Sequence, residues 1–305
     1  MRSFRYLIIF FLFMAPVMAL SALRPGDLPD ASTWYFHVDF KEMRSSDAGQ
    51  HLYAWLQDEV FEDISDDVGV DLDEEADFLT AFATEDDGLV IVIEGNISQD
   101  SEDKLVALGA ASGSLDRLGS GSKSFYYVKD DDKAEIDGDD IEIDIDSFDN
   151  GAYFSFAVNE KLIITSTREK MESLLDNKGR IKGVRGEKGQ LFILSAERNL
   201  MQAGANTADF DGWDSNILRN AEQAALLVAD KAGKISIEAQ LVTAEAEMAE
   251  SLASIVRGLI SLQVFNDDMD PEIANLLQNT DVGVSDNTLT ISVAMDPEAV
   301  VSAIE

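Results

Sequence analysis

The chain has 305 residues, of which 59 are acidic and 23 basic, so its formal net charge is −36 at neutral pH. Binding to nucleic acid or to an anionic membrane surface requires clustered Lys and Arg, and the excess of carboxylates argues against both. A hydrophobic content of 46% is typical of a globular chain with an apolar core, and the lack of cysteine excludes disulfides and argues against a structural zinc site.

The first residues have the pattern of a secretory signal peptide. Basic residues precede the apolar run Tyr6–Met14, and small residues that suit cleavage follow it. We expect residues 1–22 to form the leader, with cleavage after Ala19 or Ala22, and the mature protein to be periplasmic or extracellular with no stable membrane anchor. A leader retained as an anchor is the alternative.

The mature chain is expected to begin with a strand and a helix. Thr33–Phe40 alternates apolar and polar residues, which predicts a half-buried strand whose apolar face carries Trp34, Phe36, Val38 and Phe40. A capping pattern at Asp47 and an apolar stripe at helical spacing predict a helix that runs to about Ile64.

Four later segments repeat one pattern: a β-type run, a tight turn rich in Asp, Asn or Gly, a second such run, and a helix-start signal. They are Phe78–Gly95, Tyr153–Thr167, Ala224–Thr243 and Asp281–Pro297. Each predicts a hairpin followed by a helix. We therefore expect an α+β fold, with antiparallel sheets built from repeated hairpin–helix units, helices packed mainly on one face, and two similar halves.

Other details of these units can be predicted from local signals. Gly109–Ser124 is rich in Gly and Ser and is interpreted as a loop, and Ser166 with Glu169 is interpreted as a capping box. The longest predicted helix is Ala244–Leu262. Its apolar stripe consists of Met248, Leu252, Ile255, Leu259 and Leu262.

The basic, glycine-containing stretch Asn177–Gly189 is expected to separate two domains. It lacks apolar periodicity, which is typical of a solvated linker. We therefore predict an N-terminal α+β domain at 27–176, a basic linker at 177–189 and a C-terminal α+β domain at 190–305. An anion-binding loop is the alternative interpretation of this stretch.

The acidic run Asp130–Asp149 is the one segment whose composition points to a ligand. Crowded carboxylates are the ligands that calcium prefers, and the weak candidates here are Asp137, Asp139, Asp140, Asp144 and Asp146. The spacing does not match an EF-hand. A hairpin turn at Asp137-Gly138, followed by a strand with one solvated acidic face, also explains the pattern, and we prefer it.

No catalytic or cofactor motif is present in the sequence. The dinucleotide fingerprint, the P-loop and the G-x-S-x-G pattern are all missing, and only two histidines occur, His37 and His51. Both are interpreted as packing or surface residues. We therefore expect no enzymatic activity and no cofactor, with calcium as the weak alternative.

These observations favour an exported acidic protein with a binding, scaffold or envelope-maintenance role, whose partner is an unknown protein or envelope component. The alternative is a carrier of apolar ligands, with a pocket between a sheet and the helix Ala244–Leu262. An apolar cavity of roughly a few hundred Å³ lined by Phe and Leu would favour that carrier. A third hypothesis is a calcium-binding protein or a metal-dependent hydrolase.

Salt is expected to stabilise the folded protein, because folding gathers carboxylates that repel one another and ions screen that repulsion. At matched ionic strength, sodium and calcium chlorides should raise the melting temperature by similar amounts. Replacement of Asp139, Asp140 and Asp144 by Asn should leave this response unchanged. A saturable rise at sub-millimolar calcium, abolished by these substitutions, would instead establish a calcium site.

Overall fold

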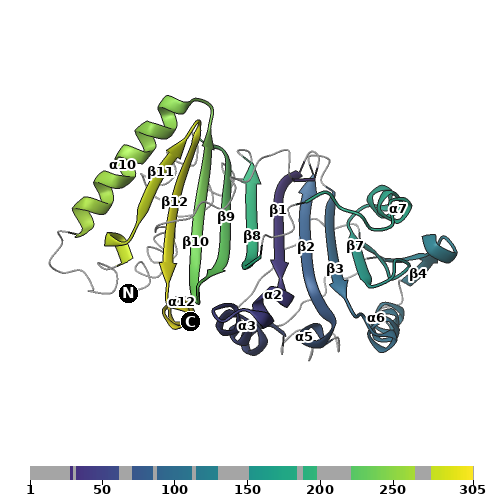
Figure 1. Cartoon of the computed structure of the whole chain (residues 1–305). Coiled ribbons are helices and arrows are strands. Elements are labelled where there is room, and N and C mark those ends of the chain that lie inside the picture. The colour runs from purple at the N-terminus through teal and green to yellow at the C-terminus, as the bar shows by residue number, and fades with distance from the viewer. Residues whose placement is uncertain are drawn as a thin grey trace. The chain divides into compact units, whose positions relative to one another are not determined.

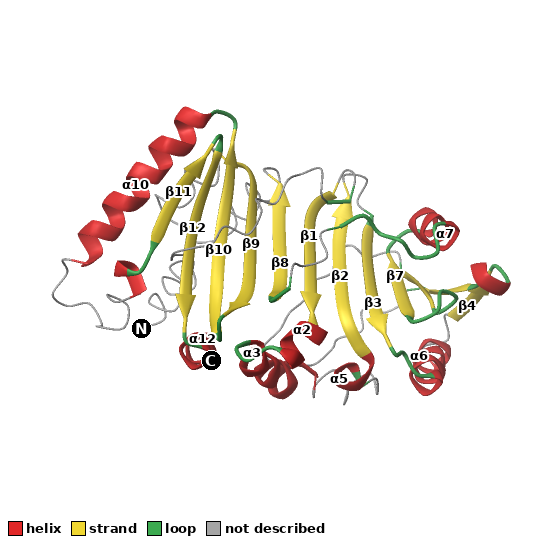
Figure 2. Cartoon of the chain, viewed as in Figure 1, coloured by secondary structure: helices red, strands yellow, loops and turns green. Residues whose placement is uncertain are grey.

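The computed structural model describes most of the chain after the predicted leader. The described residues are 28–29, 32–61, 71–84, 88–111, 115–129, 151–183, 188–197, 221–264 and 276–304. They form 12 strands and several helices, which establishes a mixed α+β protein (Figures 1 and 2). The predicted leader and the acidic run Asp130–Asp149 lie outside them.

The chain divides into two compact units, which do not follow the predicted domain boundaries. Unit 1 contains Thr33–Trp55 and Val184–Glu305, and unit 2 contains Leu28–Ser32 and Leu56–Gly183. The segment Thr33–Trp55 therefore groups with the C-terminal part of the chain, not with the rest of the predicted domain 27–176.

Unit 1 contains an antiparallel ladder in the order β11-β12-β10-β9-β8-β1. Its strands are β1 (Ser32–Asp39), β8 (Gln190–Glu197), β9 (Ala221–Lys231), β10 (Lys234–Thr243), β11 (Asp281–Ser285) and β12 (Thr288–Met295). Its helices are α2 (Phe40–Ser45), α3 (Gly49–Leu56), α10 (Ala246–Val264) and α12 (Pro297–Ile304).

Pairing between β1 and β8 attaches the N-terminal segment to unit 1, with Phe36 opposite Leu194. Two carboxylates reinforce this attachment. Asp230 Oδ2 accepts a hydrogen bond from Ala48 N at 2.7 Å, and Glu42 Oε1 accepts one from Gly189 N at 3.0 Å. Charge-assisted hydrogen bonds to backbone N–H groups are among the stronger polar contacts in proteins. They connect segments that are far apart in the sequence.

The faces of β1 differ from the prediction. Tyr35 and His37 expose only 1% and 2% of their surface, whereas Trp34 and Phe36 are half-buried. Val38 and Phe40 of the expected apolar face are buried as predicted, so the prediction is wrong at Trp34 and Phe36 and for the side that carries Tyr35 and His37. The reason is topological, because β1 pairs with β8 and the Tyr35 side of β1 continues a buried face of that ladder.

Helix α10 is present as predicted, but its packing face matches the predicted stripe only in part, at Met248 and Leu252. Its buried residues include Ala249, Leu252, Ala253 and Val256, and the last three form one cluster with Val282 of β11 and Leu289 of β12. Within the expected stripe, Ile255 and Leu262 expose 37% and 71% of their surface. Small alanines let the helix backbone approach the strands closely, which explains the choice of face.

Unit 2 contains an antiparallel ladder in the order β2-β3-β7-β6-β5-β4. Its strands are β2 (Ala76–Thr84), β3 (Leu89–Gly95), β4 (Leu115–Leu118), β5 (Phe125–Val128), β6 (Ala152–Ser155) and β7 (Lys161–Thr165). Its helical segments are a π-helical turn (Gln57–Phe61), α5 (Leu72–Glu75), α6 (Gln99–Ala111), a 3₁₀ turn (Gly121–Lys123) and α7 (Arg168–Asp176). Its core includes Val90, Val92, Ile163 and Met171, all of which are at most 1% exposed.

All four predicted hairpins are present, as β2–β3, β6–β7, β9–β10 and β11–β12. The helices α6, α7, α10 and α12 follow them in the chain. The similarity of two halves and the packing of helices mainly on one face remain predictions.

Two local predictions in unit 2 are wrong. The expected loop Gly109–Ser124 contains strand β4, because Leu115 and Leu118 pair with β5 despite the Gly and Ser residues around them. Helix α7 is capped by Thr167, whose side chain accepts from Lys170 N, and Ser166 Oγ instead accepts from Leu89 N at 2.9 Å.

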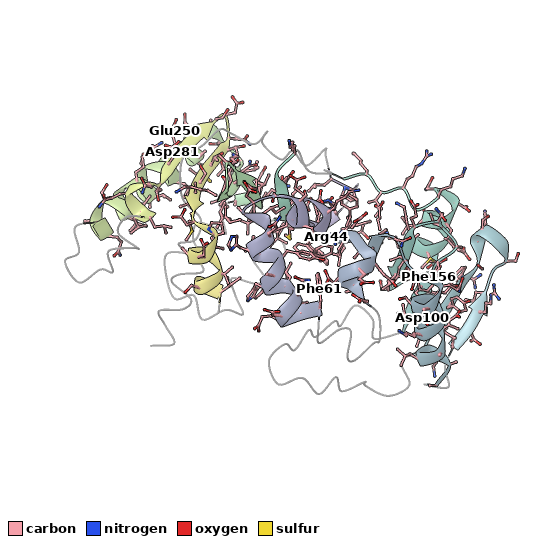
Figure 3. The ribbon with its side chains drawn as sticks, turned by 60° about the horizontal axis from the view of Figure 1, so that its bottom comes forward. Arg44, Phe61, Asp100, Phe156, Glu250 and Asp281 are labelled. Carbon is pink, nitrogen blue, oxygen red and sulfur yellow. The ribbon has the colours of Figure 1, made fainter. Side chains whose placement is uncertain are left out.

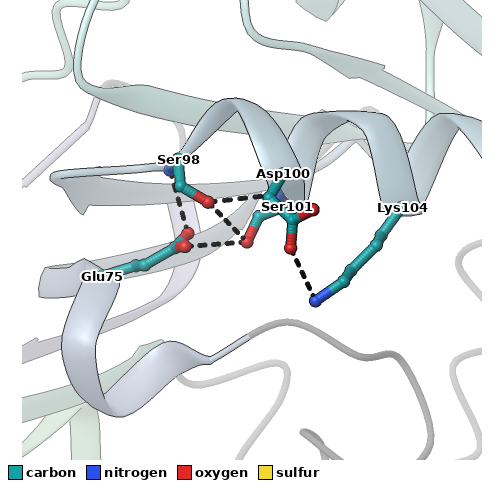
Figure 4. Close-up of polar contacts among 5 residues, drawn as sticks. All are labelled: Glu75, Ser98, Asp100, Ser101 and Lys104. Carbon is teal, nitrogen blue, oxygen red and sulfur yellow. Dashed lines mark hydrogen bonds and ion pairs between the residues drawn. The ribbon is translucent and has the colours of Figure 1, made fainter.

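The start of α6 is held by a carboxylate from a neighbouring element (Figure 4). Glu75 Oε2 accepts from Ser98 N at 3.1 Å, and Glu75 Oε1 accepts from the Ser101 hydroxyl at 2.8 Å. Ser98 Oγ in turn accepts from Ser101 N at 3.1 Å, as a helix N-cap does. Glu75 thereby joins the end of α5 to the start of α6.

Replacement of Glu75 by Ala should lower the free energy of unfolding by about 1–3 kcal/mol, because two hydrogen bonds to a charged acceptor are lost. Urea unfolding followed by circular dichroism measures this change. Glu74→Ala is the matched control, since Glu74 is exposed on the same short helix. Equal effects of the two substitutions would show that the Glu75 cap does not contribute.

Candidate functional site

The candidate site is a groove between the C-terminal half of α10 and the start of β11. It encloses about 520 Å³. Its lining residues are Arg257, Ile260 and Ser261 from α10, Leu277, Gln278 and Thr280 from the segment before β11, and Asp281 and Val282 from the strand itself. Asp281, at the first position of β11, is labelled in Figure 3.

The lining of this groove is mixed in polarity. Leu277 is 1% exposed and, with Ile260 and Val282, forms the apolar part. Arg257 and Asp281 add opposite charges at the rim. No Phe is among the lining residues, so this groove does not have the Phe- and Leu-lined character that an apolar carrier calls for.

Arg257 joins the helix to the strand. Its Nη2 donates a hydrogen bond to the backbone carbonyl of Val282 at 2.6 Å. That carbonyl belongs to β11, which ends the strand order of unit 1, so no described strand pairs with the outer side of β11. A charged side chain over a strand edge is a common way to limit uncontrolled pairing.

The direction of the backbone groups on β11 follows from its turn. Asp286 and Asn287 form a two-residue turn, and Ser285 lies opposite Thr288. In an antiparallel hairpin with such a turn, the flanking residues form a hydrogen-bonded pair and the pattern then alternates along the strand. The N–H and C=O groups of Val282 and Val284 therefore point away from β12. The hydrogen bond from Arg257 to the Val282 carbonyl agrees with this assignment, because that carbonyl must point away from β12 to accept it.

The acidic candidates for calcium binding, Asp137, Asp139, Asp140, Asp144 and Asp146, lie outside the described residues. Within the described ranges, no three His, Cys, Asp or Glu side chains come together as metal ligands would. The described helices also include none long and apolar enough to cross a membrane.

The two histidines have different environments. His37 is buried in β1, and its ring is stacked on Tyr35 with 6.4 Å between the centroids. His51 is exposed on α3, with Nε2 3.9 Å from a carboxylate oxygen of Glu298. The two histidines thus lie on separate elements, β1 and α3, each with its own neighbours.

The predicted basic linker is partly built into unit 2. After α7, Gly179 N donates a hydrogen bond to the carbonyl of Leu174 at 2.7 Å, and Gly179 has a positive φ of 63°. The Lys161 ammonium donates to the Gly179 carbonyl at 3.1 Å. The same ammonium lies 3.0 Å from Glu94 Oε2. Lys178 and Gly179 therefore form the C-terminal cap of α7.

A perturbed tyrosine lies among the aromatic residues of unit 2. Burial raises the pKa of Tyr153, and the neighbouring Tyr127 and Glu169 raise it further. The Tyr127 and Tyr153 rings lie 4.7 Å apart between centroids. A phenol with a raised pKa stays neutral at physiological pH, which suits packing and not proton transfer.

Sequence patterns did not identify the groove. Arg257 lies within a long helix between apolar residues, where a lone charge usually faces solvent. The position of β11 at the end of the ladder depends on the order of all the strands, so no local signal near Asp281–Ser285 could have shown it.

The chain matches no protein-family model and no curated protein. Among solved structures it is similar to TP0453 in three crystal forms. Crystal form IV has a TM-score of 0.49 at 10% identity, over 92% of this chain and 95% of that one. Crystal form III has a TM-score of 0.48 at 9% identity, over 93% of this chain and 99% of that one. Crystal form I has a TM-score of 0.47 at 9% identity, over 93% of this chain and 97% of that one. At these scores the likeness supports no inference about function.

Proposed function

We propose that the protein is an exported, non-enzymatic binding protein, and that it binds an extended polypeptide segment of a partner by strand addition at β11. The observation that carries this proposal is the outer edge of β11, with which no strand of the described residues pairs, beside a groove of about 520 Å³. Strand addition uses the same backbone hydrogen bonds as a sheet, and neighbouring pockets select alternate side chains.

The groove offers what an added strand needs. The outward N–H and C=O groups of Val284 provide one donor and one acceptor, and the carbonyl of Val282 has a second lone pair beside the one that Arg257 occupies. Ile260 and Leu277 supply apolar surface for one side chain of the partner. This mixture of polar and apolar groups matches a polypeptide better than a lipid.

The negative net charge of the chain favours a basic partner. The chain carries −36, so its field attracts positively charged segments and speeds their encounter. The carboxylate of Asp281 at the groove rim adds a local anion. Arg257 already donates to the carbonyl of Val282, so an added strand must form its hydrogen bonds beside that contact.

The test uses the full mature chain and a synthetic heptapeptide of alternating lysine and valine. Val284→Pro should weaken binding about two- to tenfold, because proline removes the outward N–H and with it the free energy of about one hydrogen bond. Val284→Thr, which keeps the N–H, should bind like the natural chain. Fluorescence anisotropy at physiological salt measures the affinity.

A second peptide separates strand addition from simple charge attraction. The same heptapeptide with N-methyl groups on alternate amides keeps its charge but loses the donors on one edge. We expect it not to bind. Equal affinity of both peptides, equal affinity of Val284→Pro, or no binding of the unmodified peptide would each contradict the proposal.

A further inference from the structure

One face of the unit 1 ladder carries polar residues on β10 and β12, next to apolar residues on β8 and β9. Residues directly opposite each other on paired strands share a face, so each face can be followed from strand to strand. One such row consists of His37, Ile193, Leu227, Glu238, Ser292 and Asp281. The next row consists of Tyr35, Ser195, Ala225, Gln240, Thr290 and Gly283.

The other face of the same ladder is apolar. Leu289, Ile291 and Val282 pack there against Leu252 and Val256 of α10. A sheet with one apolar and one polar face normally turns the polar face to water. Here the polar face is buried instead, with Glu238 at 1% exposure and Gln240 and Ser292 at 2%.

Glu238 is exceptional among the acidic residues. The chain has 59 Asp and Glu residues, and Glu238 is the one found fully buried in the part of the chain that the structure describes. A buried carboxylate is unfavourable unless donors surround it. A cap, a turn or a solvated face explains many of the other acids, but none of these explains Glu238.

The hydrogen bonds around Glu238 are incomplete. Gln240 Nε2 donates to Glu238 Oε1 at 2.7 Å. Glu238 Oε2 and the hydroxyl of Ser292 have no hydrogen-bond partner in the described part of the chain. By contrast, Ser195 on the neighbouring row accepts from Gln223 Nε2 at 2.9 Å and donates to the carbonyl of Ala224 at 3.2 Å.

Glu238 and Ser292 lie directly opposite each other on β10 and β12, so their Cβ atoms are about 4.5–5.5 Å apart. Their unused atoms are a carboxylate oxygen and a hydroxyl oxygen. A primary ammonium has three donors and one positive charge, and it can satisfy both acceptors at once. Calcium would require six to eight oxygens, more than these two side chains and Gln240 supply.

We propose that Glu238 and Ser292 form a buried binding point for a single primary ammonium group. The site lies on the face of β10 and β12 opposite α10, and neither Glu238 nor Ser292 lines the β11 groove, so its test does not depend on peptide binding. An amine held there would compensate the Glu238 charge and pair the Ser292 hydroxyl.

The experiment compares methylammonium with tetramethylammonium chloride on the full mature chain at matched ionic strength. The two cations carry the same charge, but only methylammonium donates hydrogen bonds. We expect methylammonium to raise the melting temperature in a saturable way, because a ligand that binds only the folded state stabilises it by mass action. Tetramethylammonium should produce no more than the effect of ionic strength.

Three variants identify the residues involved. Glu238→Gln keeps the size of the side chain but not its charge, and it should abolish the specific response to methylammonium. Ser292→Ala should shift the midpoint of that response to at least about threefold higher concentration, because one acceptor is lost. Glu222→Gln, at an exposed position on β9, should behave like the natural chain.

Equal melting shifts with the two cations would overturn the proposal, and would mean that Glu238 is compensated by bound water or within the fold. A methylammonium response that survives in Glu238→Gln would overturn it as well. Should Glu238→Gln fail to fold, an unchanged midpoint in Ser292→Ala would be sufficient to reject the site.

Discussion

The alternation of side chains along the antiparallel strands of unit 1 determines where every other feature of that unit lies. On β12, Leu289 and Ile291 face α10, whereas Thr290 and Ser292 face the opposite side. The apolar side forms a core with the helix. The polar side is left to satisfy its groups through neighbours on the same face. A shift of one residue in the β10–β12 register would exchange the two sides, so this pairing fixes both the core and the polar rows.

Burial of a helix on such a ladder requires close approach as well as apolar residues. Helix α10 meets the strands through Ala249 and Ala253, which are fully buried, with Leu252 and Val256 beside them. The same orientation places Arg257 next to the edge of β11, where its guanidinium reaches the Val282 carbonyl. The groove is thus a consequence of the way in which α10 packs. Its charged rim exists because the helix face next to the alanines carries the arginine.

Local signals were sufficient to predict the four hairpins and the helices after them, because turns, caps and strand alternation depend on residues close in sequence. The pairing of β1 with β8 was not predicted, since it joins Trp34–Val38 to residues more than a hundred positions away. The packing face of α10 was predicted only in part, at Met248 and Leu252. Its apolar residues surround much of the helix, so spacing alone did not distinguish Ile255 from Val256, and contact with Leu289 and Ile291 decided between them.

The site at Glu238 could not be predicted from local sequence patterns either. The β10 sequence Lys234–Thr243 alternates Ile with polar residues, and such a pattern indicates a strand with one solvated face. Glu238 and Gln240 do lie together on one face, but that face is buried in the structure. In a chain of net charge −36, the sequence alone does not distinguish Glu238 from the other acidic residues. Glu238 is significant because it is buried. A carboxylate in water is stabilised by solvent. Glu238 instead accepts one hydrogen bond from Gln240, and its other oxygen has no partner among the described residues.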